Sequence, residues 1–333
     1  MSDATTTHAP VPKALQHSPE ESTSSWSLKD TVRANASRAL RTLGHLWPFE
    51  IGCGRLAQTA PFEAAEPTAG DMTCTLRDGT TVYALPGDFV GRALYYFGDL
   101  DPKISWLLRE LVHEGDTVVD IGANLGLYTF LAANQVGAAG TVHAIEPQHQ
   151  LVRLLSRSKD TNDAANVKIH PVAFGDTNDT MKLYVPPGNA GAASLCRKHD
   201  PGGRRMPVPV VHAGQYLQLM QLGAVRLIKI DIEGYEATVL RAAAAVLDEN
   251  PPDYIVAEVG PDWPAPDERE TFSILRRLGY DLYNIPRTPL RNVVERFEEG
   301  ETPATPGHDV LAARPEHRDE VAASLTVQAC RTV

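Results

Sequence analysis

The chain of 333 residues has few cysteines, no long apolar segment and no excess of basic side chains. Its four cysteines lie far apart and form no C-x-x-C pair, so neither a disulfide framework nor a zinc site is expected. No apolar run approaches the roughly 20 residues that cross a bilayer, and the first residues lack the apolar core of a signal peptide. These absences predict a cytoplasmic protein with reduced thiols.

Acidic side chains outnumber basic ones by 42 to 31, which gives a net charge of -11. Broad nucleic-acid binding needs a basic face, so no nucleic-acid partner is expected. The proportions of apolar residues (43%) and charged residues (22%) are those of an ordinary globular protein. The length allows one large domain or two modest ones.

The N-terminal third is predicted to comprise a tail and a small cap. Residues 1–25 are mostly Ser, Thr, Ala, Pro and Glu, cannot bury a core, and are expected to be disordered. Residues 26–115 are assigned to a cap of helices and a hairpin. Over residues 26–47, apolar side chains recur at helical spacing with basic ones between them. Such a helix could lie on a membrane surface, but docking on its own domain is the favoured interpretation.

Within the cap, Asp78-Gly79 is a strong turn signal, because both central positions of such a turn need positive φ. The pair therefore predicts a hairpin over residues 74–85. Residues 87–102 are expected to form a loop, and residues 104–112 a helix.

From residue 116 to residue 333, strand-like and helix-like runs alternate. Strands are predicted at 117–121, 141–145, 167–173, 225–231 and 253–259, and helices at 125–134, 148–160, 213–221, 234–248 and 267–278. Two last strands, antiparallel to each other, are predicted within 280–286 and 308–315. The pattern predicts one α/β domain with a doubly wound, mostly parallel, seven-stranded sheet. The Gly-, Pro- and Arg-rich loop at 187–207 is long enough to serve as a lid over an acceptor.

A glycine-rich bend, DIGANLG, follows the first of these strands. In a doubly wound sheet, ligands bind outside the carboxyl ends of the strands. Gly122 permits a tight turn, Gly126 lets the next helix approach, and Asn124 stands where a dinucleotide fingerprint has its second glycine. Asn124 would crowd a pyrophosphate, whereas S-adenosylmethionine has no phosphate and carries a cationic sulfonium that suits Asp120. Glu146, at the end of the next strand, suits the ribose hydroxyls of either cofactor.

These segments resemble those of the FkbM family of S-adenosylmethionine-dependent methyltransferases. The resemblance spans roughly 95–315 and is most specific in KIDIEGYE, at 229–236. It implies a class I (Rossmann-like) methyltransferase domain at 116–333 and methyl transfer to a hydroxyl group, usually of a sugar or natural product. The residues that match the cofactor site are Asp120, Gly122, Asn124, Gly126, Glu146, Pro147, Ala173, Phe174 and Asp176. The chain departs from the family pattern at 210–214, which lacks a common aspartate, and at Asp101-Pro102, where Glu-Pro is common.

A second set of charged residues occupies the fourth central strand. Lys229, Asp231 and Glu233 alternate with isoleucines, which would put all three charges on one face. Lys229 is expected to pair with Asp231 and keep it ionised, Asp231 to act as general base or metal ligand, and Glu233 to place the acceptor. Glu258 ends the next strand, so Asp231 and Glu258 are the candidate ligands if a divalent metal binds, although no required metal is favoured. His212 could assist either role, but a structural role is favoured for it.

Two further residues of this segment have expected structural roles. Gly234 would give the backbone room beside the cofactor, and Glu236 would cap the helix that it starts.

Three functions are compatible with the sequence. The favoured one is an S-adenosylmethionine-dependent O-methyltransferase that acts on a small-molecule hydroxyl. A nicotinamide-dependent oxidoreductase is disfavoured because the glycine-rich bend lacks a G-x-G pattern. A catalytically silent, nucleoside-binding regulatory protein would bind the donor without turnover. The sequence identifies neither the acceptor nor the oligomeric state.

Overall fold

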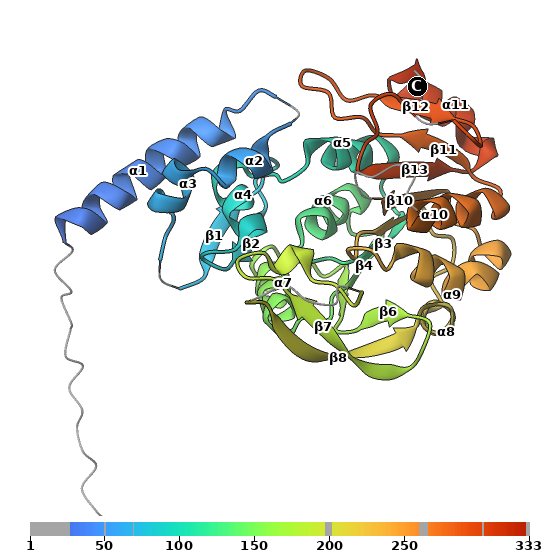
Figure 1. Ribbon diagram of the computed structural model, residues 1–333, viewed down its shortest axis with the longest axis horizontal. Coiled ribbons are helices and arrows are strands. Elements are labelled where there is room, and N and C mark those ends of the chain that lie inside the picture. Colours follow the sequence, from blue (N-terminus) through green and yellow to red (C-terminus); the bar gives the residue numbers. More distant parts are fainter. Residues whose placement is uncertain are drawn as a thin grey trace, which may run out of the picture.

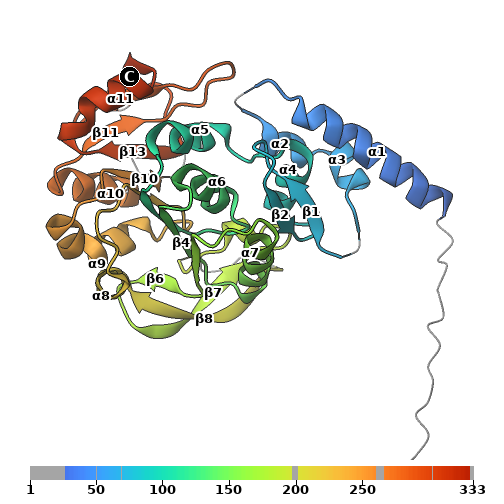
Figure 2. The ribbon, with the colours of Figure 1, turned by 180° about the vertical axis from the view of Figure 1, so that it is seen from behind.

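The structure is a computed structural model of the whole chain, and it describes residues 27–49, 51–68, 70–196, 202–259, 266–301 and 303–330. Figures 1 and 2 show a small cap, drawn in blue, beside a larger α/β body built on a central sheet. The tail that is predicted to be disordered lies outside the described residues.

The cap and the helix that follows it supply the first seven elements. They are α1 (Leu28–His45), α2 (Cys53–Ala57), α3 (Ala60–Ala65), β1 (Met72–Thr75), β2 (Thr81–Ala84), α4 (Phe89–Phe97) and α5 (Pro102–Leu111). The predicted N-terminal helix is confirmed as α1, and α5 confirms the helix that the sequence predicts at 104–112. The predicted hairpin is also confirmed, because β1 and β2 pair antiparallel around the Asp78-Gly79 turn.

The loop predicted at 87–102 is wrong, because this segment contains helix α4. Asp88 caps the helix by accepting a hydrogen bond from the backbone N–H of Gly91 at 2.9 Å. Gly98 ends it in the left-handed conformation, with φ of 66°. The glycines and the aspartate therefore mark the ends of a short buried helix rather than a loop.

The main sheet of the described residues has nine strands in the order β14-β12-β11-β13-β10-β9-β3-β4-β5. Its strands are β3 (Thr117–Ile121), β4 (Thr141–Ile145), β5 (Val167–His170), β9 (Leu227–Ile230), β10 (Tyr254–Glu258), β11 (Asp281–Asn284), β12 (Val294–Phe297), β13 (Asp309–Ala313) and β14 (Val327–Ala329). The five neighbouring strands β10, β9, β3, β4 and β5 are parallel, and β11 and β13 pair antiparallel as predicted. The predicted count of seven is wrong by two, because β12 and β14 are too short to show a clear period.

Helices cover both faces of this sheet, which confirms the doubly wound arrangement. They are α6 (Leu127–Val136), α7 (His149–Thr161), α8 (Ala213–Met220), α9 (Glu236–Glu249), α10 (Pro266–Arg277) and α11 (Arg318–Ser324), with short 3-10 turns η1 (Ala190–Ala192) and η2 (Pro315–His317). Successive residues of β3 face opposite cores. Val118 packs in the core that contains α5, α6 and α7, whereas Val119 packs in the core that contains α8, α9 and α10.

A small second sheet has the order β6-β8-β7, with β6 (Ala173–Gly175), β7 (Asp179–Val185) and β8 (Arg204–His212). The strand predicted at 167–173 is split at Pro171, which cannot donate a backbone hydrogen bond. The end of the loop predicted at 187–207 belongs to β8, where Arg204 pairs with Val185. Whether the rest of this loop covers an acceptor stays a prediction.

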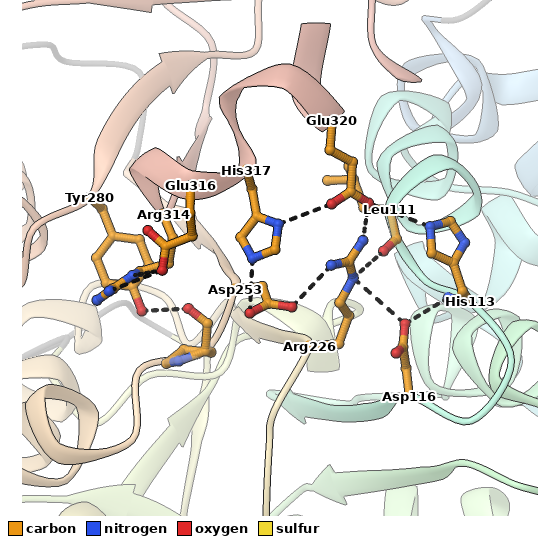
Figure 3. Close-up of polar contacts among 11 residues, drawn as sticks. Leu111, His113, Asp116, Arg226, Asp253, Tyr280, Arg314, Glu316, His317 and Glu320 are labelled. Carbon is orange, nitrogen blue, oxygen red and sulfur yellow. Dashed lines mark hydrogen bonds and ion pairs between the residues drawn. The ribbon is translucent and has the colours of Figure 1, made fainter. Parts of the chain in front are cut away.

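A charged network closes the amino end of β9, and Figure 3 shows it. The buried guanidinium of Arg226 donates to the carbonyl oxygen of Leu111 at 2.7 Å and to the carboxylate of Asp253 at 3.0 Å. It also pairs with Glu320 of α11, and lies 3.6 Å from a carboxylate oxygen of Asp116. One side chain thereby ties α5, β3, β10 and α11 together.

Candidate active site

The bend after β3 needs glycine at Gly122 for two reasons. Its φ is 85°, and a Cβ at this position would lie 2.0 Å from the carbonyl oxygen of Asp231. The loops that follow β3 and β9 are therefore in direct backbone contact. The bend and the Asp231 loop, which the sequence treats as two separate constellations, form one site.

Asn124 and Glu146 join the bend to the next strand. Asn124 has a φ of 52°, and its backbone N–H donates to Glu146 at 3.0 Å. The other oxygen of Glu146 accepts a hydrogen bond from the backbone N–H of Gln148 at 2.8 Å. Burial raises the pKa of Glu146 to about 7, although these backbone hydrogen bonds oppose the shift. Two backbone donors thus hold an acid at the carboxyl end of β4.

A cavity lies between these loops and η1. Its empty space, including the open mouth, is about 860 Å³, which is the size of a small-molecule site. Of the cofactor residues proposed from the sequence, those that line it are Gly122, Asn124, Glu146, Pro147, Ala173 and Phe174. Two buried polar atoms, Oδ1 of Asn124 and Oε1 of Gln148, have no hydrogen-bond partner within the described structure. Buried polar groups are normally satisfied, so these atoms fit a polar ligand in this cavity.

Three of the predicted cofactor residues do not line the cavity. Asp120 lies beneath it, where its carboxylate accepts a hydrogen bond from Thr129 of α6 at 2.6 Å. Gly126 begins α6 with φ of 90°, and a Cβ there would lie 2.6 Å from Leu155 of α7, so it serves helix packing. Asp176 is exposed at the end of β6.

Gln148 and its neighbour η1 were missed by the sequence reasoning. The side-chain amide of Gln148 donates to the carbonyl oxygen of Ala190 at 3.0 Å and fixes η1 against the cavity. Asp88, the cap of α4, accepts a hydrogen bond from the backbone N–H of the same Ala190 at 2.7 Å. The only available signal was that Gln148 follows closely on the proposed ribose acid Glu146.

Lys229 forms the charged floor of the cavity. Its ammonium donates to Asp231 at 3.1 Å and lies 3.6 Å from Asp120, which confirms the predicted pairing with Asp231. The ring of Tyr128 lies 4.9 Å from the same ammonium. The two carboxylates raise the pKa of Lys229 despite its burial, and the ammonium in turn lowers the pKa of Asp231 against the effect of burial. Lys229 therefore keeps Asp231 ionised.

Glu258 lies beside Asp231, as the parallel pairing of β9 and β10 predicts. Burial and then the charge of Asp231 raise the pKa of Glu258 well above its usual range. Asp309, directly opposite Glu258 in the β10–β13 pairing, is held by a buried ion pair with Lys103. Lys103 also pairs with Asp101 at 2.9 Å.

Lys103 and Asp309 were also missed by the sequence reasoning. They are separated by 206 positions, and they meet only because the fold brings the start of α5 next to the start of β13. No local pattern announces such a pair.

A second cleft adjoins the cavity, with an empty space of about 1500 Å³ including its mouth. Both are lined by Val90, Leu100, Asn124, Tyr128, Gly191 and Asp231. The cleft adds the acids Asp101, Glu233, Glu258 and Asp309 and, at α2 and after β11, Arg55 and Arg287. Asp231 therefore borders both spaces.

The remaining candidates have mainly local structural roles. Glu236 starts α9 and accepts a hydrogen bond from the backbone N–H of Ile232 at 2.9 Å, as its expected capping role requires. Gly234 has a φ of 94°, so the turn requires glycine there, and its role in leaving room for the cofactor stays a prediction. His212 caps α8 by accepting from Gln215 and lines neither space, in agreement with its favoured structural role.

Neither a metal-binding cluster nor a membrane-spanning helix occurs among the described residues. They contain no group of three or more His, Cys, Asp and Glu that could hold a metal ion. Among the described helices, none has the length and apolarity needed to cross a membrane.

Comparisons with known proteins find methyltransferases of several kinds. A family model described as "Methyltransferase FkbM domain" matches residues 120–282. No curated protein matches the chain. Among solved structures, a methyltransferase FkbM from Methylobacillus flagellatus KT shares 14% identity, with a TM-score of 0.35, over 85% of this chain and 60% of that one. A SAM-dependent O-methyltransferase from Thermotoga maritima shares 13% identity, with a TM-score of 0.37, over 73% of this chain and 77% of that one.

Proposed function

We propose that the protein methylates a hydroxyl oxygen of a small-molecule acceptor, because residues 120–282 belong to the FkbM family of methyltransferases, which use S-adenosylmethionine. The acceptor class that we propose is a sugar or another natural product. The observation that carries the proposal is that Asp231 borders both the donor cavity and the acid-lined cleft. An acceptor in the cleft would have its hydroxyl next to a carboxylate and next to the donor.

In the donor cavity, the chain offers groups that suit a nucleoside with an amino-acid tail. Glu146 would accept hydrogen bonds from ribose hydroxyls, and the unpaired oxygens of Asn124 and Gln148 would accept from amino groups. When bound, S-adenosylmethionine supplies an electrophilic methyl group on a sulfonium. Lys229 is shared between the carboxylates of Asp120 and Asp231, so it offsets only part of their negative charge beside the cavity.

In the cleft, the acids handle the acceptor proton. The acceptor oxygen forms a bond to the methyl carbon while the methyl–sulfur bond breaks, and the hydroxyl proton passes to a carboxylate. Asp231 is ionised and accepts the hydroxyl hydrogen bond, but its low pKa makes it a weak base on its own. Glu258 contacts Asp231 and has a raised pKa. Once it is ionised, it is therefore a stronger base than Asp231 and the final acceptor of the proton. Glu233 would help to place the acceptor.

The proposal is tested by measuring release of S-adenosylhomocysteine in the presence of a panel of sugars, phenols and polyketide alcohols. Product formation with a hydroxyl acceptor, and none with the matching O-methylated compound, is the expected result. Tight S-adenosylhomocysteine binding with no turnover on any hydroxyl compound, while an amine or carbon acceptor is methylated, would contradict O-methylation. Donor binding with no turnover at all would favour the silent regulatory protein.

A further inference from the structure

Helix α1 exposes a stripe of apolar side chains. Of the seven large apolar side chains that are exposed in the described structure, four lie on α1 or directly after it: Leu28 (81%), Val32 (59%), Leu43 (65%) and Leu46 (73%). At about 100° per residue, these positions fall together with Ala39 in a stripe roughly 60° wide. These five residues are called the α1 stripe below.

The α1 stripe does not hold the helix on the protein. α1 docks through its opposite side, where Ser37 and Gly44 are the buried residues. A Cβ at Gly44 would lie 2.3 Å from the carbonyl oxygen of Tyr96, so the helix packs directly on α4. Figures 1 and 2 show α1 along the outer edge of the cap, away from the central sheet. The favoured docking of this helix on its own protein is therefore correct, but the described residues leave the apolar stripe uncovered.

The charges around the α1 stripe are basic only. Lys29 and Arg33 border one side of it and Arg38 borders the other, and all three are exposed. The one acid of the helix, Asp30, lies on the far side and forms a capping box with Ser27. An apolar face with basic borders is the pattern of a helix that lies in a bilayer interface, with arginine and lysine at the phosphate level.

We infer that α1 binds the surface of an anionic lipid bilayer, with the α1 stripe inserted among the headgroups and acyl boundary. The helix has 18 residues, so the stripe extends for about 27 Å along the surface. Charge complementarity selects this occupant over a second copy of the chain. Two facing α1 helices would bring basic borders together, because neither border has an acid to pair with them.

Vesicle pelleting with the full chain tests the inference. The vesicles are phosphatidylcholine alone, or phosphatidylcholine with about one third phosphatidylglycerol. The protein is expected to pellet with the anionic vesicles only. Leu43→Asp should weaken this binding by at least about tenfold, since a leucine no longer leaves water. The matched control is Leu219→Asp, which changes a similarly exposed leucine (77%) on α8 and should leave binding unchanged.

Donor affinity and melting temperature serve as controls for folding of the two variants. S-adenosylhomocysteine affinity and melting temperature should be the same in both variants and the parent, which shows that they fold. Equal pelleting with both kinds of vesicle, no pelleting, or pelleting that Leu43→Asp does not reduce would each overturn the inference. A dimer in lipid-free sedimentation that Leu43→Asp converts to a monomer would also overturn it, and would assign the stripe to a second copy.

Discussion

Strand β9 has a charged residue at each end, and the two ends are built on opposite principles. At the amino end, the guanidinium of Arg226 is matched by the carbonyl oxygen of Leu111 and by carboxylates of Asp253 and Glu320 (Figure 3). At the carboxyl end, Asp231 lies with other acids around a cleft. Five carboxylates gather there, from Asp101, Asp231, Glu233, Glu258 and Asp309. Two buried lysines, Lys103 and Lys229, pair with three of them, and Arg55 and Arg287 also line the cleft, so the acids still outnumber the cations.

The difference separates structural charge from functional charge. A buried cation whose hydrogen bonds are all matched joins elements of the fold, and removing it leaves uncompensated acids. A cluster with more acids than cations costs stability, and shifts pKa values such as that of Glu258 upward. Such perturbed groups concentrate at sites of chemistry. The amino end of β9 is therefore expected to control stability and the carboxyl end to control turnover.

The largest expected effect is on turnover at the carboxyl end. Asp231→Asn keeps the shape of the side chain but removes its charge, and should lower the rate of methyl transfer by about 10²–10⁴. Donor affinity should stay within a fewfold. The melting temperature should fall only modestly, because buried Lys229 loses Asp231 as an ionised partner but keeps Asp120. Single-turnover rates and S-adenosylhomocysteine titration check this. Near-normal turnover would remove Asp231 from the mechanism.

The converse change at the amino end should affect stability instead. Arg226→Ala leaves Asp253 and Glu320 without their cation, and about 3 kcal/mol of unfolding free energy should be lost. Arg241→Ala removes an exposed pair with Glu270 and should cost less than about 1 kcal/mol. Urea denaturation measures both. A folded Arg226→Ala protein with the stability of the parent but slow turnover would break the division between the two ends.

The sequence contained enough local information to place the bend, the parallel strands and the Lys229–Asp231 pair. Each depends on neighbours within a few positions, such as the alternation along β9. Helix α4 was mistaken for a loop because its capping aspartate and glycines resemble turn residues. Lys103 and Asp309 could not be paired, since only the packed fold brings them together. The edge strand β14 and its neighbour β12, of three and four residues, have too little pattern to be recognised.

A smaller effect is expected for donor affinity at the end of β4. Glu146→Ala removes a charged hydrogen-bond acceptor and should weaken S-adenosylhomocysteine binding by about 1.5–3 kcal/mol, roughly tenfold to hundredfold. Because burial raises the pKa of Glu146 to about 7, donor affinity of the parent should rise as pH increases through about 7. Calorimetric titration at several pH values measures both. The variant should lose this rise, and a pH-independent parent would contradict the ribose-acid assignment.

The smallest expected effect tests whether the excess of acidic side chains around the cleft lowers the unfolding free energy. Burial and Asp231 raise the pKa of Glu258, so the folded state holds this proton more tightly than the unfolded state, where the pKa is about 4.3. The folded state therefore loses stability as pH rises from about 4.3 toward the raised pKa, because only the unfolded state releases the proton.

Glu258→Gln cannot release that proton from either state. At pH below about 4, the unfolding free energies of the variant and the parent should differ only by a constant. At higher pH, the unfolding free energy of the variant should exceed that of the parent by a growing amount. Other buried acids, such as Glu236, give both proteins the same background slope, so the difference between them isolates Glu258. The same ionisation should appear in the rate of methyl transfer as a limb that rises with pH in the parent and is absent in the variant. Parallel stability curves together with parallel rate profiles would show that Glu258 does not titrate at the site, and would leave Asp231 as the sole proton acceptor there.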